Sequence, residues 1–322
     1  MGIVYNDCGE IMGYVASYDD LCFTASIPDE EYYETWGDRI GAPLGNSEST
    51  VTGVINGIYS YNGINFDVSM VNLLEIKDNE KLVQEDRFGV DMRIVGLTID
   101  YMTRLNIQKG ISNTRVFHTS IDGLHKYCDA YLRQDAKARS NMLNKLSDYL
   151  KNIKDIEAYS IESAYNLSKF DACHRNMPTT FDASDVMLPL DMIKNMKVMI
   201  NRTVSFIDTI GPVIGCGVGI SSNGMFDVDY AEIDYITSDC LIDLKVLSSK
   251  KIEFKHILQL LSYYIMGKET RRREFKNITK IMVYNPRYNT AHILKIDDVS
   301  PELMTSVKDN ILNYKKSKTM KG

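Results

Sequence analysis

The sequence lacks the paired cysteines and histidines that mark most zinc and iron–sulfur proteins. Six cysteines are spread through its 322 residues, and none forms a C-x-x-C pair: Cys8, Cys22, Cys128, Cys173, Cys216 and Cys240. The five histidines show no H-x-x-H or H-E-x-x-H spacing. These absences argue against a zinc ribbon, a zinc hydrolase and an iron–sulfur cluster, and they favour reduced thiols in a cytoplasmic protein.

Patterns for membrane spans and nucleotide binding are missing as well. The longest apolar runs, such as residues 213–220, are far shorter than the roughly 20 residues that a transmembrane helix needs. No basic segment followed by an apolar one opens the chain, so we expect no secretory signal. The GCGVG run at 215–219 lacks the Lys-Ser/Thr of a P-loop and falls inside an expected strand. The sequence therefore predicts neither a membrane partner nor a bound nucleotide.

Charge is distributed unevenly along the chain. The net charge is −6, yet the stretch from Lys245 to Lys280 holds ten Lys/Arg and three Glu, so the rest of the chain carries −13. A basic block on an acidic body predicts a local phosphate-binding face with DNA as the partner. We assign six residues of this block to nucleic-acid binding: Lys250, Lys251, Lys255, Arg271, Arg272 and Arg273. The alternative is that a run such as KETRRREFK is only a solvated helix end.

The N-terminal third predicts a mixed α+β extension. A short acidic helix is expected at 28–36. The stretch 50–74 alternates apolar and polar residues and carries two Asn-Gly pairs, which predicts a β-hairpin or meander. Helical spacing of apolar residues begins near residue 90 and continues to about 170. We place a boundary near residue 110, with an N-terminal region at 1–110 and a helical segment plus core at 111–322.

The C-terminal half has a more regular pattern. A helix begins at Pro189 and stops at Gly211-Pro212. Strands are expected next at 213–220, 229–237 and 240–247, then a helix at 251–266 that ends at Gly267, a strand at 280–285, a last strand over AHILKI and a terminal helix at 300–314. The predicted fold class is α/β (α+β), with a mixed sheet flanked by helices.

Two of these strands carry the residues with the clearest chemical pattern. Because side chains alternate faces along a strand, Asp243 and Lys245 share one face. If Ser238-Asp239 is a two-residue turn, Asp234 lies directly opposite Asp243, with Cβ atoms roughly 5 Å apart. Two facing carboxylates repel each other, and a divalent cation such as Mg²⁺ removes that penalty. The carbonyl oxygen of Leu244 is the third candidate ligand.

The helix that follows adds a second polar face. Lys255, Gln259 and Tyr263 stand at successive i, i+4 positions, so they lie on one side of the helix. A glutamine and a tyrosine on a core-directed helix suit hydrogen bonding to phosphate or to metal-bound water. The alternative is a half-exposed hairpin with a salt bridge, followed by a helix with a packing tyrosine.

Asp, Asp-x-Lys and Gln-x-x-x-Tyr in this order resemble the PD-(D/E)XK nuclease superfamily, in particular its RecB-like branch. The resemblance covers about residues 189–285 and implies a restriction-endonuclease-like core. It implies that Asp234 and Asp243 bind Mg²⁺ or Mn²⁺, that Lys245 is the catalytic lysine, and that Gln259 and Tyr263 form the helix motif. The C-terminal half is also similar to that of bacterial and phage proteins.

The sequence departs from the family pattern upstream of the first core strand. Many relatives carry an acidic or histidine ligand on the preceding helix, and here Asp191, Asp208, Glu162 and His174 are the candidates without one being singled out. The cysteine pattern that holds an iron–sulfur cluster in some RecB-like nucleases is missing, so no cluster is expected.

We therefore expect a cytoplasmic, Mg²⁺-dependent deoxyribonuclease, with exo- or endonuclease action left open. The N-terminal region is expected to supply substrate or protein-partner contacts. The alternative is a catalytically silent nuclease-fold protein that serves a phage or mobile element as a nucleic-acid-binding, assembly, anti-defence or regulatory module.

Overall fold

The computed structural model describes residues 2–5, 11–15, 50–57, 64, 66–83, 90–108, 110–175 and 178–314. The helix predicted at 28–36 and the second Asn-Gly pair, at 62–63, lie outside the described residues. No described helix has the length and apolar character that a membrane crossing requires.

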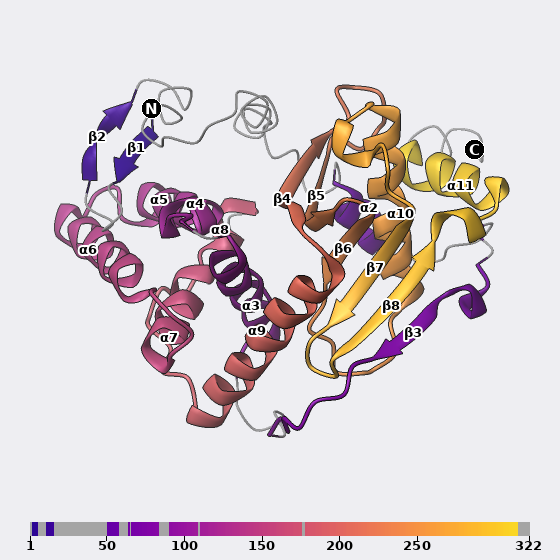
Figure 1. Ribbon diagram of the computed structural model, residues 1–322. Helices are drawn as coiled ribbons and strands as arrows, with labels where there is room; N and C mark the ends of the chain where they lie inside the picture. The colour runs from indigo at the N-terminus through magenta and orange to yellow at the C-terminus, as the bar shows by residue number, and fades with distance from the viewer. Residues whose placement is uncertain are drawn as a thin grey trace. The chain divides into compact units, whose positions relative to one another are not determined.

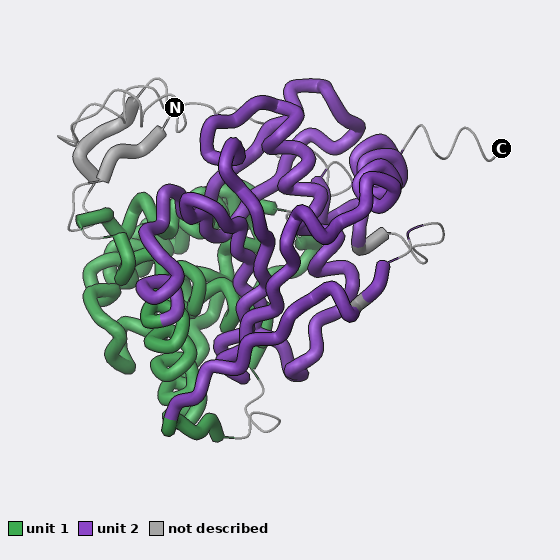
Figure 2. The backbone as a smooth tube through the Cα atoms, turned by 45° about the vertical axis from the view of Figure 1, so that its right-hand side comes forward, with its two compact units in different colours: residues 1–30, 79–205 green, residues 31–78, 206–322 purple. Residues whose placement is uncertain are grey.

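The chain divides into two compact units, each built from two separate stretches of sequence (Figure 2). Unit 1 comprises residues 1–30 and 79–205, and unit 2 comprises residues 31–78 and 206–322. This division differs from the boundary predicted near residue 110. The physical reason is that part of the N-terminal region packs and pairs with the C-terminal sheet, as described below.

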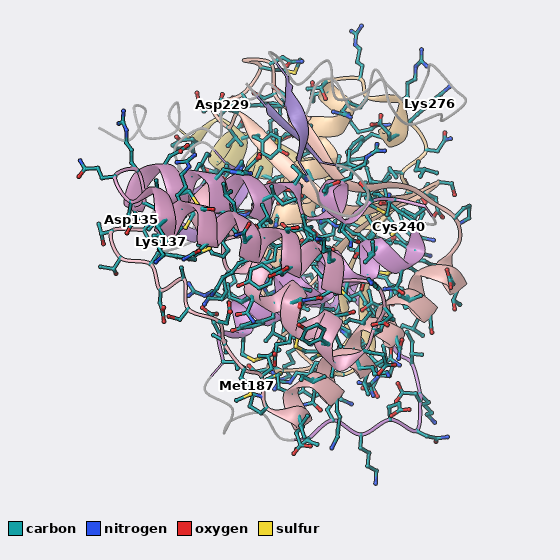
Figure 3. All side chains as sticks on the ribbon, turned by 90° about the vertical axis from the view of Figure 1, so that its left-hand side faces the viewer. Asp135, Lys137, Met187, Asp229, Cys240 and Lys276 are labelled. Carbon is teal, nitrogen blue, oxygen red and sulfur yellow. The ribbon has the colours of Figure 1, made fainter. Side chains whose placement is uncertain are left out.

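Helices dominate unit 1, in agreement with the helical spacing at 90–170. They are α3 (Met92–Ile107), α4 (Asn113–Val116), α5 (His118–Tyr131), α6 (Ala136–Asn152), α7 (Ala158–Ser168), α8 (Asp171–Arg175) and most of α9 (Leu190–Ile210). Side-chain oxygens cap the first turn of several of them. Asp91 accepts the Arg93 N–H before α3. Asp135, which is labelled in Figure 3, accepts the Ala138 N–H before α6. The same unit holds a two-stranded antiparallel sheet of β1 (Gly2–Tyr5) and β2 (Ile11–Val15).

A buried carboxylate ties three helices of unit 1 together. Asp171 at the start of α8 accepts hydrogen bonds from the Tyr101 hydroxyl of α3 (2.7 Å) and the Ser120 hydroxyl of α5 (2.9 Å). Arg175 donates to its other oxygen at 2.9 Å. Because all of these donors converge on one buried group, the network has a structural role in joining the helices.

Unit 2 is built on a six-stranded mixed sheet (Figure 1). Its strands are β3 (Asn72–Glu75), β4 (Val213–Ser221), β5 (Tyr230–Thr237), β6 (Cys240–Leu244), β7 (Lys280–Asn285) and β8 (Thr290–Lys295), in the spatial order β3-β8-β7-β6-β5-β4. Only β6 and β7 run parallel, and every other neighbouring pair is antiparallel. The predicted C-terminal strands are confirmed, and so is the mixed sheet flanked by helices.

Helix α10 (Phe254–Glu269) connects the two parallel strands and covers one face of the sheet. Its apolar side chains, among them Ile257, Leu258 and Leu261, join Leu241 of β6 and Val283 of β7 in one core. On the opposite face, Phe206 near the end of α9 stacks on Tyr284 of β7 at 4.1 Å between ring centroids. The central strands β6 and β7 are therefore buried on both sides.

Helix α10 does not end at Gly267 as predicted, but continues to Glu269. A Cβ atom on residue 267 would lie 2.2 Å from the Phe275 ring. Phe275 belongs to the short helix η4 (Arg273–Phe275), which folds back on α10. The glycine thus permits a close ring contact rather than a helix stop.

The β-hairpin predicted at 50–74 is wrong for its first part, which forms helix α2 (Val51–Gly57). Val51, Val54 and Ile55 are buried at i, i+3 and i+4 positions and join the core of α10 and the sheet. A short helix, η3 (Val68–Met70), precedes β3, which pairs antiparallel with β8 at the sheet edge. The alternating pattern was misleading because tertiary burial here follows the helical spacing hidden within it.

The chain ends with helix α11 (Pro301–Val307), which continues as the π-helical turn η6 (Lys308–Leu312). This agrees with the terminal helix predicted at 300–314. The Ser300 side chain accepts the Leu303 N–H, and Pro301 occupies the first turn. Leu303, Val307 and Ile311 extend the unit 2 core.

Candidate active site

The two central antiparallel strands bring Asp234 and Asp243 together. Tyr235 pairs with Ile242 and Ile236 with Leu241, which is the register that a two-residue connection at 238–239 produces. Continuing that register by one residue places Asp234 opposite Asp243. Asp243 lies on the α10 face of the sheet, since its strand neighbours Leu241 and Val283 belong to the α10 core, and Asp234 is close enough to raise the pKa of Asp243. The predicted register is confirmed.

The strands stop pairing at this point, and a side chain takes over the main-chain hydrogen bond. The ladder between β5 and β6 contains only those two residue pairs. Just beyond it, Asp234 Oδ2 accepts the Leu244 N–H at 2.7 Å. The Asp234 carboxylate is thereby fixed at the end of the strand pair.

Asp243 and Lys245 form a close ion pair beside it. Asp243 is 2% exposed. Lys245 Nζ donates to Asp243 Oδ1 at 2.9 Å and lies 2.7 Å from Oδ2. The Lys245 N–H donates to the Tyr284 carbonyl at 2.9 Å, which keeps residue 245 aligned with β7. The sequence prediction that Asp243 and Lys245 project from one face is therefore confirmed.

Burial and charge shift the pKa values of this pair. Burial raises the pKa of Asp243 to about 6 and Asp234 adds to the rise, while Lys245 opposes it. For Lys245, burial disfavours the ammonium, but the carboxylates of Asp243 and Asp234 outweigh burial and raise its pKa above the ordinary value. The lysine is therefore held in its charged form, and the neighbouring carboxyl is poised to exchange a proton or to accept a cation.

The oxygens of this corner suit a divalent cation. Within the described residues, Asp243 Oδ2 is buried, lies 2.7 Å from Lys245 Nζ and makes no hydrogen bond of regular geometry. The Lys245 N–H points to β7, and in a trans peptide the Leu244 carbonyl must point the opposite way, toward β5 and Asp234. Two carboxylates and a main-chain carbonyl thus converge, which is a donor set that Mg²⁺ accepts when water completes its shell.

The described residues contain no cluster of three or more His, Cys, Asp or Glu side chains arranged for a metal. A cation at this corner would therefore depend on Asp234, Asp243 and main-chain or water oxygens. Three upstream ligand candidates belong to unit 1. Asp191 pairs with Lys194 and Glu162 accepts the Leu188 N–H. His174 Nδ1 lies 3.9 Å from Asp122 and makes no hydrogen bond within the described residues. Asp208, in unit 2, is exposed.

The predicted helix motif lies over this corner and gains a partner. Gln259 Nε2 donates to the Tyr263 hydroxyl at 2.6 Å and to Thr52 Oγ1 of α2 at 3.3 Å. The hydroxyls of Thr52 and Tyr263 are 3.4 Å apart. Burial raises the pKa of Tyr263 to about 12, with Asp243 adding to the rise and Lys245 opposing it, so the phenol is close enough to sense both charges. Sequence reasoning missed Thr52, since its segment was assigned to a hairpin.

Two further residues missed by sequence reasoning shape the loop after β6. Asn285 at the end of β7 is fully buried, accepts the Leu247 N–H at 3.4 Å and donates to the Ser249 carbonyl at 3.0 Å. At the start of α10, His256 Nδ1 accepts the Glu253 N–H at 3.2 Å. Burial first, and then the ammonium groups of Lys245 and Lys255, lower the pKa of His256 to about 4. No spacing in the sequence signals either role.

The six basic residues assigned to nucleic-acid binding differ in their surroundings. Lys250 pairs with Glu75 at 3.0 Å and Lys255 with Glu253 at 2.9 Å. Arg272 is largely buried, pairs with Glu274 at 2.8 Å and donates to the Gly219 carbonyl at 2.9 Å. Lys251, Arg271 and Arg273 are exposed.

Arg271 also lines a surface hollow of about 580 Å³ at the C-terminal end of α10, formed with Asn223, Met225, Lys268, Glu269 and Thr270. None of the residues of the carboxylate corner lines this hollow. Within the described residues, the hollow and the carboxylate corner are therefore separate places on unit 2.

Comparison with family models, curated proteins and solved structures gave no match for this chain. Its function is therefore argued from its own residues and their geometry.

Proposed function

We propose that the protein is a metal-dependent nuclease that hydrolyses DNA phosphodiester bonds in the cytoplasm, on a restriction-endonuclease-like core. The observation that carries the proposal is the proximity of Asp234 to Asp243, which forms an ion pair with Lys245. A purely structural salt bridge needs neither the second carboxylate nor the polar face of α10. The combination of these groups supports hydrolysis of a phosphate ester.

Asp234, Asp243 and the Leu244 carbonyl would hold Mg²⁺ or Mn²⁺. Such an ion, when bound, lowers the pKa of a water molecule and offsets negative charge on the phosphate. The protein contributes the carboxylates in fixed positions, since Asp234 is anchored by the Leu244 N–H and Asp243 by strand β6. Preorganised groups of this kind need no rearrangement as the reaction proceeds.

Lys245 acts as a donor in this proposal. The carboxylates of Asp243 and Asp234 raise the pKa of Lys245, which favours the ammonium over a neutral amine that would take a proton from water. The ammonium instead donates a hydrogen bond to a non-bridging phosphate oxygen as negative charge builds there. Water adds to phosphorus, the P–O bond to the leaving nucleotide breaks, and the leaving oxygen takes up a proton.

The test is cleavage of linear, circular and single-stranded DNA with Mg²⁺ or Mn²⁺. Asp234→Asn and Lys245→Met are expected to lower the cleavage rate at least about 10²-fold, because each removes one charge from the site. Asp129→Asn is the matched control, since it changes an exposed carboxylate that pairs with Arg139 at 2.7 Å in unit 1. Equal rates in the site variants and the wild type, or no cleavage by any protein, would contradict the proposal.

One observation favours the second candidate, a silent nuclease-fold protein that binds nucleic acid or regulates another assembly. The described residues offer only two acidic side chains at the corner, and Lys245 already neutralises one of them. In that case the wild type binds DNA without cleaving it, and Asp234→Asn binds at least as tightly because repulsion of phosphate is reduced. Measuring both DNA cleavage and DNA binding for the wild type and these variants therefore decides between the two functions.

A further inference from the structure

Three polar side chains from two separate parts of the chain meet next to Lys245 and Asp243. Gln259 and Tyr263 come from α10. Thr52 comes from α2 and precedes Gln259 by 207 residues in the sequence. Their mutual distances are 2.6, 3.3 and 3.4 Å. Tyr263 is 3% exposed, whereas Thr52 is exposed, so the triangle reaches from the protein interior to its surface.

Hydrogen-bond counting leaves one donor proton of this triangle without a partner inside it. The amide of Gln259 supplies two protons and each hydroxyl supplies one, four in total. The three contacts use three of them: Gln259 donates to both hydroxyls, and one hydroxyl donates to the other. One hydroxyl proton therefore remains to be donated outside the triangle.

The surroundings of Thr52 show why its hydroxyl faces this position. Val51, Val54 and Ile55 bury one side of α2 against α10 and the sheet. The Thr50 side chain accepts the Gly53 N–H at 3.0 Å, which fixes the start of the helix. With its neighbours held in the core, Thr52 projects its hydroxyl along the exposed edge of α2 toward Gln259.

We propose that Thr52, Gln259 and Tyr263 form a phosphate-binding subsite that takes a backbone phosphate of a nucleic-acid strand. This inference rests on the proposed function and gives the N-terminal region a part in it. A phosphate diester only accepts hydrogen bonds, so it can take the one hydroxyl proton that the triangle leaves to be donated. Neutral donors also suit a place beside two carboxylates, because they bind phosphate without forming an ion pair with Asp234 or Asp243.

The test measures binding of a short fluorescein-labelled DNA oligonucleotide by fluorescence anisotropy, with Ca²⁺ in place of Mg²⁺. Thr52→Val keeps the shape of the side chain and removes the hydroxyl, whereas Thr52→Ser keeps the hydroxyl. Thr305→Val is the matched control on exposed α11, where the hydroxyl donates to the Pro301 carbonyl of its own helix at 2.9 Å. Inorganic phosphate is added as a competitor to separate a strand phosphate from free phosphate.

We expect Thr52→Val to weaken oligonucleotide binding about tenfold, as for one hydrogen bond to a charged group. Thr52→Ser and Thr305→Val are expected to bind as the wild type does. The slope of log Kd against log salt should not change in Thr52→Val, because no cation is lost. Inorganic phosphate at millimolar concentration should not displace the oligonucleotide.

Several results would overturn the subsite. Wild-type affinity in Thr52→Val would do so, as would an equal loss in Thr52→Ser, or the absence of oligonucleotide binding by the wild type. Displacement by inorganic phosphate would assign the subsite to free phosphate instead of a strand. If binding behaves as expected but no DNA is cleaved with Mg²⁺ or Mn²⁺, then the hydrolytic function fails while the subsite stands.

Discussion

Single residues at the candidate site are kept charged or neutral by what surrounds them. Asp243 is buried, and both of its carboxylate oxygens lie within 2.9 Å of Lys245 Nζ. Removing only one member of a buried pair leaves an uncompensated charge, which costs more than the pair itself contributes. Replacing Lys245 alone is therefore expected to destabilise the protein, because the Asp243 carboxylate would stay buried without its cation.

His256 gives a pH-dependent prediction at the residue scale. Its pKa is lowered to about 4 from 6.5, mainly by burial, so the unfolded chain takes up a proton at a pH where the folded chain does not. The stability from neutral His256 is complete above pH 6.5 and is lost as the pH falls from 6.5 toward 4. The loss amounts to at most about 3 kcal/mol. Urea unfolding at a series of pH values between 7 and 4 measures it.

His256→Gln is the matched variant for this prediction. A glutamine oxygen can accept the Glu253 N–H in place of His256 Nδ1, since Gln is a common residue at the third position of a helix. It does not titrate in this range. The variant should therefore lose less stability than the wild type between pH 7 and pH 4. Parallel pH curves for the two proteins would show that His256 does not carry the effect.

At the scale of elements, short-range patterns predicted the C-terminal half well. The β5–β6 register follows from a two-residue connection at 238–239, and strand β7 begins and ends where the sequence predicts. The sequence could predict that Asp234 lies close to Asp243, because their proximity depends on a local hairpin. The sequence could not predict that the Leu244 N–H donates to Asp234, because this hydrogen bond requires the strands to stop pairing one residue earlier.

The same level of reasoning was wrong at α2. Its Asn-Gly pair at 56–57 favours a hairpin locally, yet it lies at the end of a helix. The choice depends on burial of Val51, Val54 and Ile55 against α10, two hundred residues later in the chain. Neither the pattern nor the turn residues hold that information, and the contribution of Thr52 to the site was hidden for the same reason.

Helices α5 and α8 give a prediction at the element scale. A Cβ atom on Gly123 of α5 would lie 1.9 Å from the Phe170 carbonyl oxygen and 3.1 Å from the His174 N. Alanine normally stabilises a helix interior by roughly 0.5–1 kcal/mol relative to glycine. Here the obstacle is main chain that cannot rotate away, so Gly123→Ala should instead destabilise the protein by about 2–3 kcal/mol. Urea unfolding followed by circular dichroism measures the change.

Asp129→Ala on the same helix is the control for helix propensity. Asp129 is exposed, and its ion pair with Arg139 contributes less than about 1 kcal/mol. This variant should therefore stay close to the wild type. A Gly123→Ala protein that is as stable as the wild type would mean that α5 and α8 do not pack as closely as the structure has them.

At the scale of the whole molecule, each of the two units is formed by two separate stretches of the sequence. Residues 31–78 belong to unit 2, although unit 1 precedes and follows them in sequence (Figure 2). Unit 2 thus contains α2 and β3 from the N-terminal region together with the C-terminal sheet. A boundary drawn from composition alone does not detect this, since no linker sequence marks the crossings.

This organisation predicts that two N-terminal truncations behave differently. A chain of residues 50–322 keeps α2 and β3, whereas a chain of residues 79–322 loses both. The shorter chain no longer buries Val51, Val54 and Ile55, each worth about 1.5–3 kcal/mol. That total is comparable with the whole stability of a typical domain, about 5–15 kcal/mol.

We therefore expect 79–322 to unfold at a much lower urea concentration than 50–322 and to bind more of the hydrophobic dye ANS, since the face of α10 that α2 covers becomes exposed. It should also lose affinity for the labelled oligonucleotide, because Thr52 is removed with α2. Circular dichroism at 222 nm follows the unfolding of each chain. Identical urea midpoints for the two truncations would show that α2 adds nothing to the core. If the 50–322 chain unfolded at a lower urea concentration than the 79–322 chain, this result would contradict the division into units.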